Sequence, residues 1–317
     1  MGAKQLTTLV VGGAGFIGSR LVELLVASSA REVWVLGRSA LPRQALPDGV
    51  RYIQGDASDS RCMQALLATC DEVIDLAYAT VPKSSFDDPV HDLMSNLPPT
   101  VNLLQEACRH RLRRFLLVSS GGTVYGPAFS LPITESHPTN PISPYGITKL
   151  ALEKYALMFH RLEGLPVVIA RPGNPFGPAQ VGNQGQGFIG AAIWATLRRQ
   201  PVCIFGERGT VRDYLHVDDL AEGLLAALDH GAIGATYNIG TGQGLDNREV
   251  LDQLMPLAQA ANYEIALKHL PARVFDVSAN VLCSASLTEL SGWRPRQSFS
   301  SALARTWEAA LRAGSAA

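Results

Sequence analysis

A tyrosine and a lysine spaced for proton transfer lie near the middle of the chain. Tyr145 and Lys149 occur in the segment Ser143-Pro144-Tyr145-Gly146-Ile147-Thr148-Lys149, and the apolar periodicity that follows it predicts a helix. Residues four apart share one face of a helix, so the two side chains are expected to be neighbours. An ammonium near a phenol favours the phenolate and lets it exchange protons below its ordinary pKa of about 10. The pair predicts acid–base catalysis by Tyr145, assisted by Lys149.

A glycine-rich turn near the N-terminus predicts a phosphate site. Closely spaced glycines lie between the apolar run 9–11 and an amphipathic stretch, in the order Gly12-Gly13-Ala14-Gly15-Phe16-Ile17-Gly18. Glycines permit a tight turn and close backbone approach, and a helix N-terminus offers free N–H groups to a pyrophosphate. The strand before and the helix after the turn favour dinucleotide binding over a turn without a ligand. The expected contacts are Gly12, Gly15, Phe16, Ile17 and Gly18.

The end of the second apolar run bears on the choice between NAD and NADP. An acid commonly stands there to accept from the adenosine ribose hydroxyl, but this chain has Gly37-Arg38-Ser39. A guanidinium can accommodate a 2′-phosphate, so Arg38 makes NADP a candidate beside NAD; an ordinary exposed arginine is the alternative. Asp56, which follows the strand-like stretch 50–54, is a candidate for the adenine edge.

A parallel sheet would position these groups. Apolar runs at 9–11, 33–36, 73–77, 115–118 and 167–170 alternate with segments of helical spacing. This alternation predicts an α/β fold with a doubly wound parallel sheet of the Rossmann type. The Tyr145–Lys149 pair then follows the fifth strand, which favours catalysis over a chance surface pair.

The alternation of strand-like and helical segments ends after Arg171. Pro172, Pro175 and Pro178 there precede a glycine-rich stretch at 182–187 that predicts a loop. Short strands at 202–205 and 236–239 and helices at 188–197, 218–228, 247–257 and 300–311 are expected beyond it. We therefore predict a dinucleotide-binding domain over 1–171, to which 205–240 partly returns, and a smaller, mostly C-terminal substrate lobe over 172–317.

Composition narrows the class of protein. The 317 residues are 47% hydrophobic and 17% charged, with no apolar run near the roughly 20 residues of a membrane span. The net charge of -1 provides no general field for a polyanion, so neither nucleic acid nor membrane is expected as a partner. Five scattered cysteines without a C-x-x-C pair argue against disulfides and zinc, and no export signal is recognised. We expect a cytoplasmic protein without a metal, in which His216 has a structural role.

Taken together, the motifs resemble the extended short-chain dehydrogenase/reductases, in particular the nucleotide-sugar epimerases and dehydratases. The resemblance spans essentially the whole chain and is more specific for the family than for the reaction. The matching segments are Gly12-x-x-Gly15-x-x-Gly18, Ser119-Ser120-Gly121-Gly122-Thr123-Val124-Tyr125-Gly126, Tyr145-x-x-x-Lys149, Arg171-Pro-x-Asn174-x-x-Gly177, Arg212-Asp-Tyr-x-His-Val-Asp-Asp219, Arg273-x-x-Asp276 and Gly292-Trp293.

The resemblance implies roles for individual residues. Tyr145 is implied as the catalytic acid and base, and Lys149 as its partner, which also contacts the nicotinamide ribose. Asn174, Arg212, Arg273 and Asp276 match positions that hold a sugar nucleotide, and a near-neutral protein does need discrete cations for a diphosphate; surface salt bridges are the alternative for the two arginines. The coenzyme site is further expected to include Ala57, Leu76 and Ala77. The helical segments 103–108 and 150–159 are candidates for a homodimer face, as in relatives.

One position departs from the family pattern. Relatives carry Ser or Thr four residues before the tyrosine of the Val-Tyr-Gly stretch, hydrogen-bonded to the reacting sugar hydroxyl, whereas this chain has Gly121. Thr123 is the expected substitute in catalysis and substrate binding, with Ser120 or a water as alternatives.

The leading hypothesis is a nucleotide-diphospho-sugar 4-epimerase of polysaccharide biosynthesis with bound NAD or NADP. It would oxidise C4 transiently, let the 4-keto intermediate turn, and reduce it on the other face. An NADPH-dependent 4-keto-sugar reductase is the alternative, favoured by Arg38. A dehydratase is disfavoured because Gly122-Thr123 stands where dehydratases carry Asp-Glu. A non-catalytic dinucleotide sensor is the remaining hypothesis, disfavoured by the presence of Tyr145 and Lys149.

Overall fold

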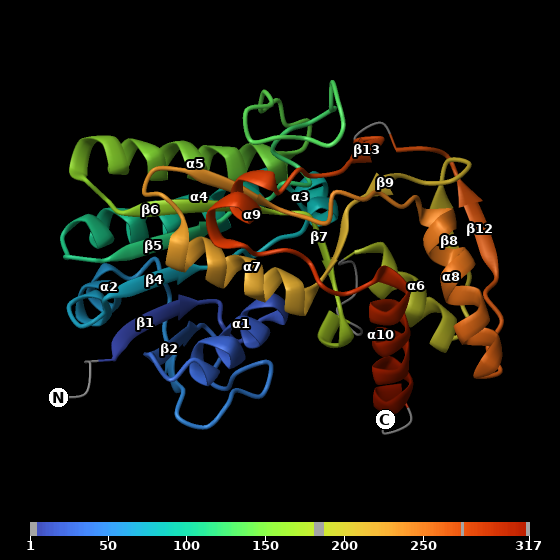
Figure 1. Ribbon diagram of the computed structural model, residues 1–317, viewed down its shortest axis with the longest axis horizontal. Coiled ribbons are helices and arrows are strands. Elements are labelled where there is room, and N and C mark those ends of the chain that lie inside the picture. The colour runs from blue at the N-terminus through green and yellow to red at the C-terminus, as the bar shows by residue number, and fades with distance from the viewer. Residues whose placement is uncertain (1–4, 181–186, 274–275, 315–317) are drawn as a thin grey trace.

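Seven parallel strands form the central sheet, in the order β11-β6-β5-β4-β1-β2-β3 (Figure 1). The computed structural model describes residues 5–180, 187–273 and 276–314. The strands are β1 (Leu6–Val11), β2 (Arg31–Gly37), β3 (Arg51–Gln54), β4 (Glu72–Asp75), β5 (Arg114–Val118), β6 (Val167–Pro172) and β11 (Thr236–Ile239). The order reverses between β1 and β4, and this switch point is where doubly wound sheets bind ligands. The predicted Rossmann-type fold is confirmed.

Helices cover both faces of this sheet (Figure 1). On one face α1 (Phe16–Ala27) and α7 (Val217–His230) pack beside α9 (Ala285–Ser291), burying Leu21 and Leu220 against Val10. On the other, α2 (Ser60–Leu67), α4 (Pro89–Cys108) and α5 (Pro144–Glu163) bury Met63, Leu103 and Leu152. The short α3 (Pro82–Asp87) lies against α4 and α5. None of the described helices has the length and apolar character needed to cross a bilayer.

A smaller lobe follows β6 and has its own core around Ile193, Leu254 and Trp307. It contains three parallel strand pairs, β7 (Asn174–Phe176) with β10 (Tyr214–His216), β8 (Val202–Phe205) with β12 (Leu267–Leu270), and β9 (Val211–Arg212) with β13 (Ala279–Asn280). Its helices are α6 (Phe188–Leu197), α8 (Asn247–Ala260), α10 (Phe299–Gly314) and the 3-10 turn η1 (Pro178–Gln180). Most of the predicted loop at 182–187 lies outside the described residues; Gly187 caps α6.

Strand β4 is shorter than its apolar run predicted. It ends at Asp75 rather than at Ala77, and the Asp75 Oδ1 atom accepts a hydrogen bond from the Ala77 backbone N–H at 3.0 Å. This side-chain bond turns the chain out of the sheet at the switch point. Leu76 and Ala77 therefore line the edge where a ligand can bind, instead of continuing the strand.

Helix α5, which carries Tyr145 and Lys149, is fixed at both ends. The Ser143 Oγ atom accepts from the Gly146 N–H at 3.1 Å, Pro144 occupies the first turn, and Gly164 ends the helix with a left-handed φ of 74°. These are favoured capping residues at each position. Between the caps, Thr148, Lys149 and Glu153 are buried toward the sheet. The predicted helix start and shared face are confirmed.

A buried ion pair ties α5 to β6. The Arg171 Nη2 and Nε atoms donate to the Glu153 carboxylate at 2.6 and 2.9 Å, and both side chains are less than a tenth exposed. Ser119 also donates to Glu153, and the Arg171 Nη1 atom donates to the Tyr125 hydroxyl at 2.9 Å. The network joins the ends of β5 and β6 to α5, so it fixes the position of α5 on the sheet.

Breaking this pair should destabilise the fold strongly. Glu153→Gln leaves the buried Arg171 guanidinium without its counter-charge, so the free energy of unfolding should fall by about 3 kcal/mol or more. The control is Asp252→Asn, which removes an exposed i, i+4 partner of Arg248 and should cost less than about 0.5 kcal/mol. Urea unfolding followed by circular dichroism measures both, and equal costs would contradict the assignment.

Candidate active site

A cleft of about 1320 Å³ runs from the carboxyl edge of the large sheet into the smaller lobe. Every residue predicted from the sequence to bind coenzyme or substrate lines it. These are Gly12, Gly15, Phe16, Ile17, Gly18, Arg38, Asp56, Ala57, Leu76, Ala77, Thr123, Tyr145, Lys149, Asn174, Arg212, Arg273 and Asp276. The topology explains the convergence, because the carboxyl ends of parallel strands share one edge.

The glycine turn is shaped for a ligand approaching its backbone. Gly12 has a φ of 79°, and a Cβ there would lie 3.0 Å from the Ala77 backbone nitrogen. A Cβ at Gly18 would lie 2.6 Å from the Gly12 carbonyl oxygen. Gly15 begins α1, and no side chain caps the helix. The first N–H groups of α1 are thus available to an anion, which fits the pyrophosphate of a dinucleotide.

The edge of the cleft beyond β2 carries positive charge. Arg38, Ser39 and Arg43 line it, and Arg38 is exposed. The Tyr52 hydroxyl donates to the Ser39 carbonyl at 2.7 Å and fixes the loop. Asp56 also lines the cleft, but its Oδ1 atom already accepts from the Ser58 N–H and hydroxyl at 2.9 and 2.8 Å. One oxygen of the Asp56 carboxylate is thus already engaged by Ser58, whereas the Arg38 side chain is exposed at the same edge.

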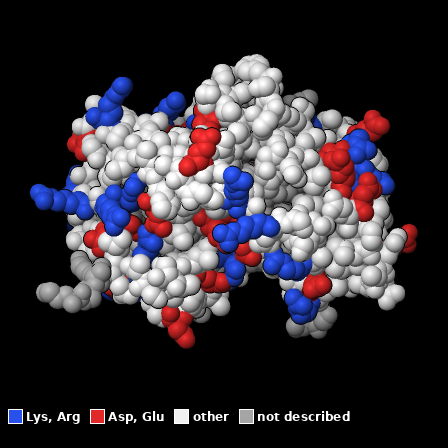
Figure 2. Space-filling view, viewed as in Figure 1, with Lys and Arg blue, Asp and Glu red and all other residues white. Residues whose placement is uncertain are grey.

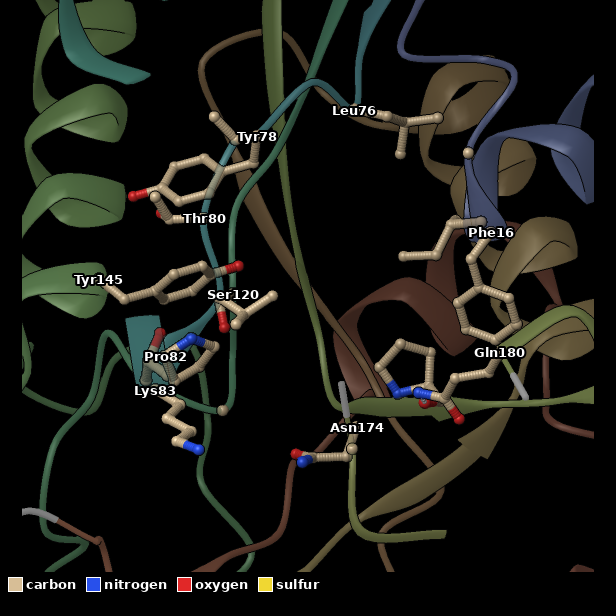
Figure 3. Close-up of a pocket in the computed structure, with 18 of the residues that line it drawn as sticks. Phe16, Leu76, Tyr78, Thr80, Pro82, Lys83, Ser120, Tyr145, Asn174 and Gln180 are labelled. Atoms are coloured by element: carbon tan, nitrogen blue, oxygen red, sulfur yellow. Dashed lines mark hydrogen bonds between the residues drawn. The ribbon is translucent and has the colours of Figure 1, made fainter. Parts of the chain in front are cut away.

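Tyr145 and Lys149 lie together where β4, β5 and α5 meet. Figure 3 shows the Tyr145 hydroxyl directed into the cavity beside Ser120. The Lys149 Nζ atom donates to the Val118 carbonyl at 2.9 Å and lies 6.0 Å from the Tyr145 ring centroid. It lies closer to another phenol, 4.2 Å from the Tyr78 ring centroid. The lysine is thus held by the sheet edge and by an aromatic ring that the sequence analysis did not consider.

The protonation of this pair follows from burial. Desolvation lowers the pKa of Lys149 to about 8, although Asp75, Glu153 and Asp92 oppose the change. Desolvation, with a smaller contribution from Asp92, raises the pKa of Tyr145 above its ordinary value. The spacing of Tyr145 and Lys149 predicts that the ammonium lowers the pKa of the phenol, but in the structure burial of the phenol dominates and raises it. At neutral pH the tyrosine is a proton donor beside an ammonium.

The turn after β5 brings hydroxyl groups to the cleft. A Cβ at Gly121 would lie 2.5 Å from Leu282 Cδ1, so this position faces the core. Thr123 and Ser120 both line the cleft. The Thr123 Oγ1 atom is buried and has no hydrogen-bond partner among the described residues. An orphaned buried hydroxyl is costly, so a ligand oxygen at this point would satisfy it.

Cations line the other end of the cleft, in the smaller lobe. The Arg212 Nη1 atom donates to the carbonyls of Val211 and Val277 at 2.9 and 2.7 Å, and burial lowers its pKa. The Arg273 guanidinium lies 3.4 Å from the Phe205 ring centroid. The nearby charge of Asp276 partly opposes this lowering of the Arg212 pKa. Asn174 lines the cleft beside the turn after β5, because a Cβ at Gly122 would lie 3.1 Å from its Oδ1 atom.

Several lining residues escaped the sequence analysis. Tyr78, Thr80 and Lys83 follow β4, and Figure 3 shows them on the wall that carries Tyr145, across from Phe16 and Gln180. Their position after a strand at the switch point could have identified them. Phe188, Trp194, Phe205 and Asn247 line the lobe end, but nothing in the local sequence distinguishes these residues from core residues.

The remaining charges do not suggest another kind of site. Figure 2 shows Lys and Arg interspersed with Asp and Glu on the face in view. Within the described ranges, no group of three or more His, Cys, Asp or Glu side chains is arranged to hold a metal ion. His216 is the N-cap residue of α7, and its Nδ1 atom accepts a hydrogen bond from the Asp218 N–H at 3.3 Å. This capping is a structural role.

Comparison with known proteins identifies the family to which this chain belongs. Residues 8–240 match the model of the NAD dependent epimerase/dehydratase family. The chain belongs to this family. It is 32% identical to the UDP-glucose 4-epimerase of Mycolicibacterium smegmatis over 307 residues, which cover 95% of this chain and 97% of the relative.

Solved structures of family members superimpose closely. The UDP-glucose 4-epimerase of Thermus thermophilus in complex with NAD has a TM-score of 0.87 and 32% identity, covering 96% of this chain and 99% of that one. The dTDP-glucose 4,6-dehydratase of Streptomyces venezuelae with NAD bound has a TM-score of 0.88 and 29% identity, covering 97% of each chain. This family member is therefore an enzyme with an NAD or NADP coenzyme, for which the glycine turn and the uncapped α1 provide the fitting cradle.

Proposed function

We propose that this enzyme is a nucleotide-diphospho-sugar 4-epimerase. The observation that carries the proposal is one continuous cleft with a dinucleotide turn at one end, two arginines at the other, and Tyr145, Lys149 and an orphaned hydroxyl between them. Such a cleft suits a coenzyme and a sugar nucleotide placed with their reactive ends together. Curated relatives named UDP-glucose 4-epimerase support the reaction.

Tyr145 is proposed to exchange the proton of the sugar 4-hydroxyl. When bound, the nicotinamide supplies the acceptor and later the donor of a hydride. In the epimerase the Tyr145 phenol must first lose its own proton, because burial raises its pKa. The resulting phenolate, which the Lys149 ammonium would stabilise, then takes the 4-hydroxyl proton and returns it at the end. Thr123 is proposed to accept or donate a hydrogen bond at the reacting oxygen. No net redox change results, because C4 would regain the hydride that it lost, and the tyrosine would return the proton that it took.

Epimerisation requires the intermediate to turn while its nucleotide stays bound. Arg212 and Arg273 are proposed to hold the diphosphate and nucleoside, with Asp276 and Asn174 completing that end. Arg212 is already fixed by two backbone carbonyls, so little side-chain entropy is lost when a ligand binds. Tight binding of the nucleotide combined with loose binding of the hexose lets the 4-keto sugar present either face.

A 4-keto-sugar reductase is the second candidate. Arg38, Ser39 and Arg43 line the adenosine end without an acid at the end of β2, which favours NADPH. The raised pKa of Tyr145 also favours proton donation, the only role that a reductase asks of it. The two candidates differ in stoichiometry, because a reductase consumes one coenzyme for each sugar.

The substrate assay separates these functions. Purified protein is incubated with UDP-glucose, UDP-N-acetylglucosamine, dTDP-glucose, their 4-epimers and the corresponding nucleotide-linked 4-keto sugars, with and without NADPH. The dinucleotide released from the protein is weighed by mass spectrometry. Interconversion without added coenzyme supports the epimerase. Stoichiometric NADPH oxidation on 4-keto sugars supports the reductase, and inactivity on the whole panel leaves a dinucleotide sensor. Tyr145→Phe should abolish either activity; an active Tyr145→Phe protein would refute the mechanism.

The Thr123 hydroxyl should be needed for turnover. Thr123→Val keeps the shape of the side chain and should lower kcat about 10²-fold, the effect typical of a positioned catalytic group. Thr123→Ser retains the hydroxyl and should keep most of the activity. If Thr123→Val turns over like the parent protein, the reacting oxygen is held by Ser120 or by water.

The outer face of α4 and α5 is proposed to form a homodimer. The structure buries Leu103, Leu104 and Ala107 of the predicted segment 103–108 in the core, so that segment was wrong. The exposed apolar side chains of the two packed helices are instead Val90, Leu93, Met94, Tyr155, Met158 and Leu162. Such an apolar face on adjacent helices suits a four-helix contact. Light scattering should give twice 33.9 kDa. The paired change Leu93→Asp with Met158→Asp should give a monomer, whereas Ile233→Asp, on another surface, should not.

The reaction is proposed to occur in the cytoplasm and to supply sugar donors for polysaccharide biosynthesis. All five cysteines are unpaired, which suits a reducing compartment. An epimerised nucleotide sugar keeps its activated diphosphate bond, so its consumer would be a glycosyl transfer reaction.

A further inference from the structure

A second tyrosine, Tyr78, contacts both members of the proposed catalytic pair. Its ring centroid lies 4.2 Å from the Lys149 Nζ atom and 4.7 Å from the Tyr145 ring centroid, with the two rings inclined at 62°. The first distance is that of a cation–π contact and the second that of an edge-to-face aromatic pair. Figure 3 shows the Tyr78 hydroxyl directed away from the cavity, opposite to the Tyr145 hydroxyl. Tyr78 therefore presents its ring, not its proton, to the site.

The hydroxyl of Tyr78 is anchored on a buried carboxylate. It donates to the Asp92 Oδ1 atom at 3.4 Å, while Thr148 donates to Oδ2 at 2.7 Å and Thr80 also donates to Oδ1. Asn96 supports Thr80 by donating to its hydroxyl at 3.1 Å. Asp92 has no exposed surface. These hydrogen bonds behind the ring fix the orientation of the Tyr78 side chain.

The ammonium of Lys149 is thus held on two sides. One of its three N–H donors is used by the Val118 carbonyl, and the Tyr78 ring covers a second direction. Val118 is its hydrogen-bond acceptor among the described residues. A donor therefore remains for a ligand in the cleft.

We propose that Tyr78 is a positioning residue for the proton transfer, which holds the Lys149 ammonium on its ring face and packs against the Tyr145 ring in an edge-to-face contact. This proposal rests on the proposed function for its catalytic consequence, but its structural part concerns Lys149 alone. A ring face stabilises the charged form of a lysine that burial opposes. Tyr78 therefore keeps Lys149 charged in a site where desolvation favours the neutral amine.

Other charged groups around Lys149 must be considered in any titration. Asp75 on β4, Asp92 on α4 and Glu153 on α5 face it and raise its pKa, while Arg171 on β6 is bound to Glu153. Tyr145 and Tyr78 remain protonated, because burial raises the pKa of both. A change at Tyr78 leaves all three carboxylates in place, so its effect can be separated from theirs.

The test is a titration of Lys149 by NMR in the Tyr78 variants. The chain has only five lysines, Lys4, Lys83, Lys149, Lys154 and Lys268, so ¹³C-lysine labelling gives few resonances, and Lys149→Arg assigns the one of interest. In the parent protein Lys149 should titrate near pH 8. Tyr78→Leu keeps the wall apolar but has no ring face, and the pKa should fall by about half a pH unit or more. Tyr78→Phe retains the ring and should restore the parent value.

The kinetic consequence follows the same order. With Tyr78→Leu, kcat should fall about tenfold, the alkaline limb of the pH profile should move down with the Lys149 pKa, and KM should change less than about threefold. Tyr78→Phe should recover most of kcat, and urea unfolding confirms that both variants fold. An unchanged Lys149 titration in Tyr78→Leu overturns the proposal. An inactive parent protein with a shifted Lys149 titration would instead overturn only the proposed function.

Discussion

The buried ammonium of Lys149 is the constraint on which the arrangement of the site depends. A lysine that is 5% exposed loses most of its hydration, and a charge is tolerated there only with compensating partners. The fold supplies a carbonyl from β5, carboxylates from β4, α4 and α5, and an aromatic face from the loop after β4. Each partner comes from a different element, so the charge can be held only when the sheet and both helices are assembled.

The carboxylates near Lys149 are themselves restrained. Glu153 is bound by Arg171 and Ser119, Asp92 by Thr148 and Thr80, and Asp75 accepts from the Ala77 N–H. None of them is therefore free to move to the lysine and form a direct ion pair that would occupy its donors. The result is a cation stabilised at a distance, with an N–H group left for the cleft. Stability and function here use the same residues.

Much of this architecture could be predicted from the sequence, because its determinants are local. The glycine turn between strand and helix, the caps of α5 and the Tyr145–Lys149 spacing each depend on a few adjacent residues. The edge of the sheet was also predictable, since parallel strands place their carboxyl ends together. Two features of the site could not be predicted from the sequence. Tyr78 lies 71 positions before Lys149 in the chain, so no local pattern links them. The pKa of Tyr145 depends on its burial in the folded chain, which no local pattern encodes.

The distribution of cations explains how a chain of net charge -1 can serve two anionic ligands. Arg38 and Arg43 line the adenosine end, Arg212 and Arg273 line the lobe end, and Lys149 lies between them. A single strongly basic patch would bind polyanions indiscriminately, whereas separated cations recognise two diphosphates by their spacing. The guanidinium groups at both ends of the cleft stay charged at any physiological pH. The middle uses an amine whose pKa of about 8 is near neutrality. In the proposed function, permanent charge would anchor the ligands, and titratable charge would serve the step in which a proton moves.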